Sequence, residues 1–396
     1  MNPCMTMNET PSSERVHIGF FGSRNAGKSS LVNAVTGQEL AVVSEVKGTT
    51  TDPVRKAMEL LPVGPVLIID TPGIDDAGAL GELRVRKTKQ VLNQTDVAVL
   101  VVDGAAGGGL SASDSELLQF FRAKNVPYIV AYNKCDLLSA VPASVSNSEI
   151  HVSAVQKINI EALKNRIAAL AHTDEKKLRI AGDIVQAGDF VVLVTPIDTA
   201  APKGRLILPQ QQTIRDILEA DAAAIVVKEF ELRDTLAALG KKPALVITDS
   251  QVFAKASADT PPDVPLTSFS ILFARYKGFL LPAVRGAAAL NTIEDGDKIL
   301  ICEGCTHHRQ CDDIGTVKLP RWIRSHCGKE PRFDFTSGGG FPDELGAYKL
   351  IVHCGACMLN DRETRWRQKC AEDQRVPFTN YGVLIAFMQG ILKRCV

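Results

Sequence analysis

The chain has 396 residues, and its 45 lysines and arginines balance 45 aspartates and glutamates. A net charge of zero gives no bulk field to attract nucleic acid or an anionic membrane, and no apolar run approaches the roughly 20 residues of a membrane-spanning helix. The N-terminus lacks the basic and apolar segments of a secretion signal, so we expect a cytoplasmic protein of two or three domains with no nucleic-acid or membrane partner.

The distribution of cysteines separates the C-terminal third from the rest. Ten cysteines in a cytoplasmic chain are typical of reduced thiols or metal ligands rather than disulfides. Only Cys4 and Cys135 precede residue 300, whereas eight lie between Cys302 and Cys395. We therefore expect the metal-binding part of the chain in its C-terminal third.

The first predicted domain, residues 14–172, opens with a phosphate-binding loop. A buried strand at 16–21 runs into Gly22-Ser23-Arg24-Asn25-Ala26-Gly27-Lys28-Ser29, which has the GxxxxGK[ST] pattern and is followed by apolar residues at helical spacing. Glycines let backbone N–H groups surround phosphates. We expect Lys28 to contact the β- and γ-phosphates and the Ser29 hydroxyl to bind magnesium. The nucleotide-binding residues predicted here are Asn25, Ala26, Gly27, Lys28, Ser29 and Ser30.

Two further motifs predict the magnesium and γ-phosphate contacts. Thr50 lies in a loop after Gly48, where a threonine completes the magnesium shell when a γ-phosphate is present. A predicted strand at 66–69 ends in Asp70-Thr71-Pro72-Gly73. This position lets Asp70 hold magnesium, directly or through water, and lets the Gly73 N–H sense the γ-phosphate.

The base-recognition motifs indicate guanine. Predicted strands at 97–102 and 128–131 precede Asn133-Lys134-Cys135-Asp136. The Asp136 carboxylate can accept two hydrogen bonds from the N1 and N2 edge of guanine, and adenine offers no such pair of donors. His151-Val152 leads to Ser153 and Ala154, whose backbone can contact the guanine carbonyl. The motif therefore selects GTP, with Asn133, Lys134, Asp136, Ser153 and Ala154 as base-site residues.

These motifs resemble the small-GTPase superfamily over about 135 residues, and most closely the branch that includes the tRNA-modifying GTPase MnmE and the ribosome-assembly GTPase Era. The resemblance implies a potassium ion held partly by Asn25. Ile74 stands where Ras-like proteins have their water-orienting glutamine, so Asp75 or Asp76 is the candidate for that role, unless both are solvated acids. No arginine stands out as a built-in finger, and we expect turnover well below ~5–20 per second. The predicted catalytic set is Lys28, Thr50, Gly73, Asp75 and Asp76.

The middle domain, residues 177–262, is predicted to be a small parallel α/β unit, because strands and helices alternate along it. It contains no phosphate loop, metal-ligand spacing or catalytic pairing, and we interpret Asp198 and Lys203 as solvated loop residues. Such a unit is a natural association surface, so we expect it to mediate homodimerisation. Residues 257–265 contain three prolines and are interpreted as a linker. The predicted strands are 190–194, 223–227 and 245–247, and the predicted helices are 213–219 and 231–239.

The third domain, residues 266–396, has thiols after two predicted strands, 298–302 and 348–352. Sites in open α/β sheets form beyond the carboxyl ends of strands. If the two strands are neighbours, Cys305, Cys354 and Cys357 can converge, and three thiolates suit zinc or an iron–sulfur cluster. The candidates for a fourth ligand are His307, His353 and Asp312.

The remaining cysteines of this domain are weaker candidates. Cys302 lies inside a predicted strand and is expected to be a buried core thiol. Cys311 and Cys327 have no close partner in sequence, and Cys370 and Cys395 fall in predicted helices.

Cys305-Thr306-His307 and His353-Cys354-Gly355-Ala356-Cys357 resemble the CxH…HCxxC pattern of the FeFe-hydrogenase maturation GTPases, the HydF family. The resemblance covers almost the whole chain. It implies three α/β domains: a P-loop GTPase, a parallel dimerisation domain and a cluster-binding domain. It also implies a 4Fe-4S cluster on Cys305, Cys354 and Cys357, with a variable fourth site filled by His307, His353, Asp312 or an outside ligand.

The implied role is a scaffold that uses GTP/GDP, magnesium and potassium, receives a transient di-iron precursor from two radical-SAM maturases and passes it to apo-FeFe-hydrogenase. The implied oligomer is a homodimer or higher. Two other hypotheses stay open at this point. One is an RNA- or ribosome-associated GTPase with a structural zinc site, and the other is a redox enzyme that uses the CxxC pair as a dithiol.

Overall fold

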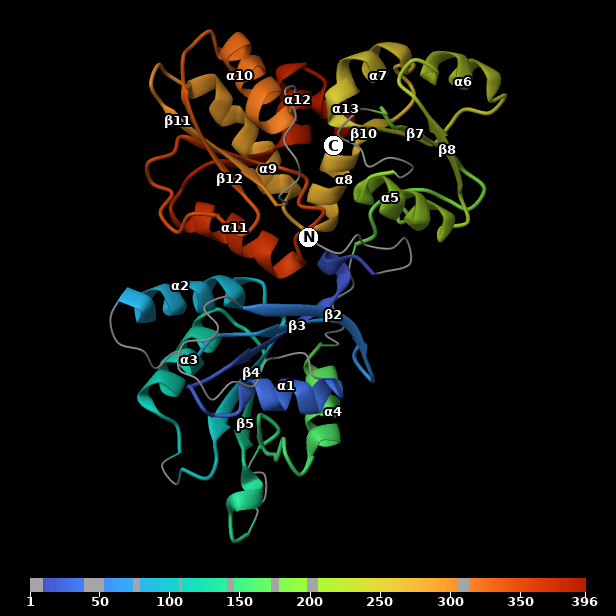
Figure 1. The fold of residues 1–396 in the computed structure, drawn as a ribbon. Helices are drawn as coiled ribbons and strands as arrows, with labels where there is room; N and C mark the ends of the chain where they lie inside the picture. The colour runs from blue at the N-terminus through green and yellow to red at the C-terminus, as the bar shows by residue number, and fades with distance from the viewer. Residues whose placement is uncertain are drawn as a thin grey trace. The chain divides into compact units, whose positions relative to one another are not determined.

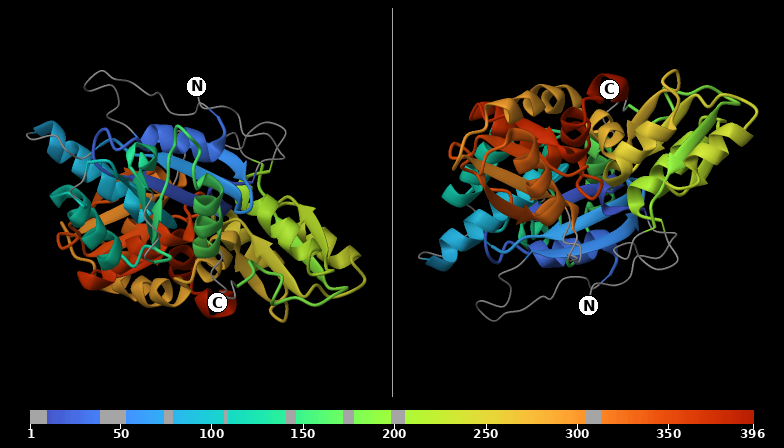
Figure 2. Two further views of the ribbon diagram at one scale, coloured as in Figure 1. Left: turned by 90° about the horizontal axis from the view of Figure 1, so that it is seen from below. Right: turned by 90° about the horizontal axis from the view of Figure 1, so that it is seen from above.

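The computed structural model describes residues 10–38, 53–73, 79–106, 109–140, 146–171, 178–197, 206–304 and 313–396. The chain divides into two compact units, residues 1–175 and 176–396. It is an α/β protein whose three sheets can be followed by colour in Figure 1 and in the two further views of Figure 2. No helix within the described ranges is long and apolar enough to cross a membrane.

The first unit is a six-stranded sheet of order β2-β3-β1-β4-β5-β6, in which β2 alone runs antiparallel to its neighbour. The central strands are apolar on both faces because helices cover both. α1 and α4 pack on one face and α2 and α3 on the other (Figure 1). The strands are β1 Val16–Phe21, β2 Val54–Leu60, β3 Gly64–Asp70, β4 Val97–Asp103, β5 Tyr128–Asn133 and β6 Glu149–His151, and the helices are α1 Lys28–Thr36, α2 Ala79–Asn93, α3 Ala112–Ala123 and α4 Ile160–Ala171.

The second unit contains two four-stranded sheets that are parallel throughout. The first has the order β10-β9-β7-β8 and the second the order β12-β11-β13-β14. The strands are β7 Phe190–Val194, β8 Ala223–Val227, β9 Leu245–Thr248, β10 Leu266–Ser268, β11 Lys298–Glu303, β12 Arg332–Ser337, β13 Leu350–His353 and β14 Phe378–Asn380. The helices are α5 Leu208–Leu218, α6 Leu232–Ala238, α7 Phe253–Asp259, α8 Phe269–Tyr276, α9 Leu280–Ala287, α10 Leu319–Cys327, α11 Asp361–Asp373, α12 Tyr381–Met388 and α13 Leu392–Cys395.

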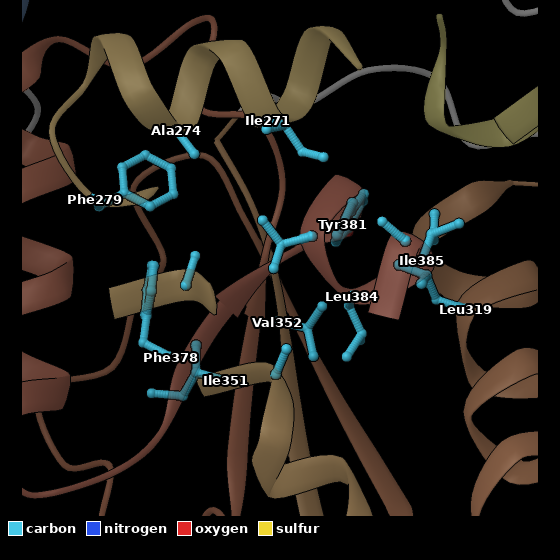
Figure 3. Close-up of a cluster of buried hydrophobic side chains, with 14 of the residues drawn as sticks. Ile271, Ala274, Phe279, Leu319, Ile351, Val352, Phe378, Tyr381, Leu384 and Ile385 are labelled. Carbon is cyan, nitrogen blue, oxygen red and sulfur yellow. The ribbon is translucent and has the colours of Figure 1, made fainter. Parts of the chain in front are cut away.

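Helix α8 belongs to the cores of both sheets in this unit. Its Ile271 and Ala274 are buried with residues of β13 and β14, and Figure 3 shows them above Val352 and Phe378. Its opposite face, with Leu272 and Phe273, is buried in the core of the β7 sheet. The two sheets are therefore joined by one shared helix rather than by a free linker.

The structure differs from the sequence prediction at the middle of this unit. β10 falls after the predicted boundary at 262–266, yet it pairs with β9 and completes the middle sheet. The helical pattern over 269–290 is two helices, because the chain turns at Gly278, whose φ is +83°. Among the described strands, β2, β10, β12 and β14 were not predicted.

Candidate functional site

The phosphate-binding loop has the backbone that its glycines predict. Gly27 has φ +87°, and a Cβ there would lie 2.3 Å from Asn133 Nδ2, so only glycine fits. The Lys28 ammonium is buried at the loop and donates to the carbonyls of Gly22 (2.9 Å) and Ser23 (2.6 Å). The loop is thus closed around the lysine that would contact the phosphates.

Ser29 and Asp70, the two predicted magnesium ligands in the described chain, lie side by side. Ser29 Oγ donates to Asp70 Oδ2 at 2.8 Å, while Asp70 Oδ1 is buried with no hydrogen-bond partner. Burial raises the pKa of the Asp70 carboxyl, and the Ser29 hydroxyl and the Lys28 charge oppose this shift. A partnerless buried carboxylate oxygen next to a serine hydroxyl fits a divalent cation, whose charge would stabilise the ionised form.

The segment predicted to sense the γ-phosphate is held against the phosphate loop at its start. Thr71 Oγ1 donates to the Phe20 carbonyl at 2.7 Å, and a Cβ on Gly73 would lie 3.0 Å from Arg24 Cα. This close approach explains why residue 73 is a glycine. Thr50, Asp75 and Asp76 lie outside the described residues, so their predicted roles stay predictions.

The residues predicted to recognise the base lie at the carboxyl ends of β5 and β6. The Asn133 amide donates to the Ala26 carbonyl at 3.0 Å and accepts from the Ala154 N–H at 3.1 Å. Asn133 therefore ties the phosphate loop to the Ser153-Ala154 segment. Asp136 is exposed, as a carboxylate that receives a base must be.

Two anchors of this site were missed in the sequence. Lys134 forms an ion pair with Asp103 at the end of β4, at 2.6 Å. Ser23 of the phosphate loop donates to Asp114 Oδ1 at 3.0 Å, and the same carboxylate completes a capping box with Ser111 at the start of α3. An S-x-x-D capping box is visible in sequence, but its contact with the phosphate loop is not.

The thiol loop lies where the sequence predicts, beyond the carboxyl end of β13. β11 and β13 are neighbours with Cys302 paired to His353, and the Cys354 N–H donates to the Cys302 carbonyl at 2.9 Å. Cys354 Sγ accepts from the N–H groups of Gly304 (3.1 Å) and Ala356 (3.4 Å). Burial raises the pKa of the Cys354 thiol, and these two N–H groups oppose the shift. A sulfur with two backbone donors fits a metal-bound thiolate, since such donors stabilise its charge.

His353 is turned away from metal ligation by its hydrogen bonds. Its ring is fully buried, Nδ1 faces the Cys354 carbonyl at 2.9 Å, and Nε2 faces Arg367 Nη1 at 3.0 Å. A guanidinium only donates, so Nε2 accepts and the proton is on Nδ1. Burial, with the Arg367 charge second, lowers the pKa of His353 to about 3. With neither nitrogen lone pair open, the structure argues against His353 as a fourth ligand.

Arg367 itself was not predicted, although it lies behind the thiol loop. It is buried, forms an ion pair with Glu363 at 2.6 Å and also donates to the Gly338 carbonyl. The charged stretch 361–374 looks like an exposed helix face in sequence, and only the i, i+4 spacing of Glu363 and Arg367 indicates a pair.

The structure does not describe the other predicted ligands. Cys305, His307 and Asp312, together with Cys311, lie outside the described residues. Within the described ranges, no three His, Cys, Asp or Glu side chains are grouped closely enough to hold a metal ion. Cys302 is a buried core thiol as expected, and its burial raises its pKa to about 12.

Three family models match the chain in succession. The 50S ribosome-binding GTPase model matches residues 17–134, the hydrogen maturase F dimerization domain matches 180–278, and the hydrogen maturase F tetramerization domain matches 281–396. The two maturase models together extend over more than half of the chain, and one ends at Gly278 where the other begins at Leu281.

Curated relatives match part of the chain. The tRNA modification GTPase MnmE of Laribacter hongkongensis is 36% identical over 140 residues, which are 35% of this chain and 30% of that protein. MnmE of Desulfotalea psychrophila is 37% identical over 158 residues, 37% of this chain and 32% of that protein. The chain thus spans about a third of the length of these relatives. A solved structure of a probable GTP-binding protein engB is 30% identical and covers 39% of this chain and 98% of its own, with a TM-score of 0.32.

Proposed function

We propose that this chain, which belongs to the hydrogen maturase F family and carries an N-terminal P-loop GTPase domain, is a GTP-hydrolysing scaffold that carries a di-iron precursor to apo-FeFe-hydrogenase. The observation that supports this best is the combination of sites on one chain. A magnesium-type pair, Ser29 with Asp70, stands in the first unit, and a CxxC loop with backbone donors on Cys354 stands in the second.

In the GTPase domain, separate residues would bind the nucleotide and support its hydrolysis. Lys28 would neutralise the β- and γ-phosphates, Ser29 and Asp70 would hold magnesium, and Asp136 would select guanine. Thr50 and the Gly73 N–H would contact the metal and the γ-phosphate. Asn25, exposed with φ +62° at the tip of the loop, is the proposed potassium contact. Asp75 or Asp76 would orient the attacking water, with slow turnover.

In the second unit, Cys305, Cys354 and Cys357 would hold a 4Fe-4S cluster. Gly304, the residue before Cys305, already donates to the Cys354 sulfur, which supports grouping these thiols. A cubane anchored by three thiolates leaves one iron for an exchangeable ligand, either His307, Asp312 or a group from outside. The di-iron cluster itself is cargo, delivered by two radical-SAM maturases and released to the hydrogenase.

Association of copies is part of this proposal. β8 is one of the two edge strands of the middle sheet as described, and its Val226 is 42% exposed. An apolar edge strand of this kind pairs readily with another chain. We propose that a homodimer forms through the middle domain and that the protein works in the cytoplasm, where its thiols stay reduced.

Anaerobic purification and one pair of variants test the proposal. The wild type should be brown, with broad visible absorption and an electron-spin signal after reduction. Cys354→Ser should remove the cluster and hydrogenase activation while leaving GTP hydrolysis unchanged. Cys327→Ser, a partly exposed thiol of α10, is the matched control and should keep both.

Two results would contradict the proposal. A colourless, zinc-containing wild type would favour the ribosome- or RNA-associated alternative, and a colourless metal-free protein with a reducible disulfide would favour the dithiol enzyme. Loss of GTP hydrolysis together with the cluster in Cys354→Ser would show that the two sites are not separable.

A further inference from the structure

A stretch of sequence occurs twice in the second unit. Residues 264–280, VPLTSFSILFARYKGFL, and residues 376–392, VPFTNYGVLIAFMQGIL, share Val, Pro, Thr, Leu, Ala, Gly and Leu at positions 112 apart. Each stretch forms the fourth strand of its sheet and the following helix, β10 with α8 and β14 with α12. Both helices are capped by the side chain of the last strand residue, Ser268 or Asn380.

The two sheets have the same topology and register. In each, the first strand lies between the second and the third, and the fourth is at the edge. The pairing of Cα atoms makes the row Val194, Thr248, Ser268 equivalent to the row Cys302, His353, Asn380. The strand register is independent of the repeated sequence, and both place Ser268 at the position equivalent to Asn380.

The turn that leads into each first strand is also repeated. Gly188-Asp189 and Gly296-Asp297 both have the glycine at positive φ, +79° and +83°. Asp189 Oδ2 accepts from Gln186 N, and Asp297 Oδ2 accepts from Glu294 N, both at 2.9 Å. The same side-chain contact at both places extends the correspondence to the start of the sheets. We call residues 186–287 the first repeat and 294–395 the second repeat.

The thiol loop has a counterpart without sulfur. The register makes Asp249 equivalent to Cys354, and both accept from the N–H two residues on, Gln251 or Ala356. Both donate their own N–H to the first strand, Asp249 to Val194 at 3.2 Å and Cys354 to Cys302 at 2.9 Å. The loop geometry therefore belongs to both repeats, and the thiols to the second alone.

The last helix of each repeat packs on the other repeat. α9 lies against β14, where a Cβ on Gly286 would be 2.1 Å from the Phe378 carbonyl and the Phe279 and Phe378 rings are 5.8 Å apart. α13 lies against β10, where Thr267 Oγ1 donates to the Cys395 carbonyl at 2.9 Å. Such reciprocal contacts are typical of a two-fold symmetric pair whose members exchange their last helices, and here both members belong to one chain.

The same reciprocity appears at the two loops. Ser270 of α8 and Gly382 of α12 are equivalent positions and touch each other, since a Cβ on Gly382 would be 2.8 Å from Ser270 Cβ. Ser270 Cα lies 3.5 Å from the position that a Cβ on Gly355 would take. Ser250 is the equivalent of Gly355, and its Oγ lies 3.2 Å from the position that a Cβ on Gly382 would take. Each helix start thus packs on the loop of the other repeat.

We infer that residues 186–395 are a tandem duplication folded as an internal two-fold pair, and that the first repeat forms one wall of the thiol site through Ser270. Cys357 adds a second contact of this kind, because it packs against the core that contains Phe269, Leu272 and Phe273 of α8. Ser270, Gly355 and both thiols are each partly exposed, so this wall borders the open side of the loop. Ser270 is a positioning residue. Its role in holding a cluster rests on the proposed function, whereas its contact with the loop does not.

The test measures thiol reactivity in the metal-free full-length protein. Ser270→Gly removes the wall and should speed alkylation of Cys354 and Cys357 by iodoacetamide about fivefold, because the loop opens more readily. Ser270→Ala keeps the Cβ and should restore the wild-type rate. Ser250→Gly makes the same change at the two-fold-related contact, whose loop has no thiol, and should leave the rate unchanged. Cys327 is an internal reference whose rate should be constant throughout.

Two outcomes would overturn the inference: an unchanged rate in Ser270→Gly, or an equal acceleration in Ser250→Gly. After anaerobic reconstitution, Ser270→Gly should also shift the electron-spin spectrum of the reduced cluster, and Ser250→Gly should not. If the wild type takes up no iron while the alkylation pattern holds, the proposed function fails and the internal pair stands. If iron binds normally in every variant, and all variants share the same electron-spin spectrum and the same alkylation rate, the inferred wall at Ser270 fails and the proposed function stands.

Discussion

Replacing Arg367 with leucine tests the buried network behind the thiol loop. The guanidinium is almost fully buried, with an ion pair to Glu363 at 2.6 Å and hydrogen bonds to His353 Nε2 at 3.0 Å and to the Gly338 carbonyl. Arg367→Leu leaves the Glu363 carboxylate buried without its partner, and it leaves two acceptors without donors.

The expected loss follows from this imbalance. Removing one member of a buried ion pair costs about 3–5 kcal/mol of unfolding free energy, mostly from the charge that remains. Replacing both members removes that charge, so Arg367→Leu combined with Glu363→Leu should recover most of the loss, to within about 2 kcal/mol of wild type. The double variant therefore separates the cost of an unpaired charge from that of poor packing.

The assay can be confined to the second unit. The chain has two tryptophans, Trp322 in α10 and Trp366 in α11, and both lie in residues 176–396. Urea unfolding followed by tryptophan fluorescence therefore reports this unit. With a slope of about 3 kcal/mol per molar, the single variant should lower the midpoint by about 1–1.7 M. A shift below about 0.3 M, or a double variant less stable than the single one, would refute the buried pair.

Three further predictions concern other parts of the chain. Asp136→Asn should lower the affinity for GTP by at least about tenfold and raise that for xanthosine triphosphate, because an amide donates where the carboxylate accepts; nucleotide titration that shows unchanged GTP binding would contradict the base assignment. Val226→Lys should convert the dimer to monomer in light scattering, since a charge on β8 blocks edge pairing; an intact dimer would exclude that edge. The hydrogen bond from Arg275 lowers the pKa of Asp183, so the stability from this pair is present above pH 3.8 and lost as the pH falls through the lowered pKa. Asp183→Asn should flatten the pH dependence of the urea midpoint below pH 4, and an unchanged slope would count against the ion pair.

The nucleotide site was predictable because its chemistry is local. The phosphate loop is eight consecutive residues between a strand and a helix, and the observed β1 and α1 flank it as predicted. The thiol loop was predictable for a similar reason, since it follows the apolar run that became β13. Whether β11 and β13 are neighbours was left open by the sequence, and the tertiary structure decided it by pairing the two strands.

The missed strands lacked the signal that strand prediction uses. β12 is an edge strand with mostly exposed or half-buried residues, and β14 has three residues. β2 is exposed over most of its length. None has a long apolar run, and each lies at the edge of its sheet with a single neighbouring strand.

The sequence alone determined the order of the domains, the nucleotide class and the thiols available, because each depends on residues close together in the chain. Only the tertiary structure decided that Arg367 is buried, that His353 is turned from metal ligation and that α8 is shared by two sheets. Burial and two-fold contacts depend on segments about a hundred residues apart, and no local pattern specifies which of them meet.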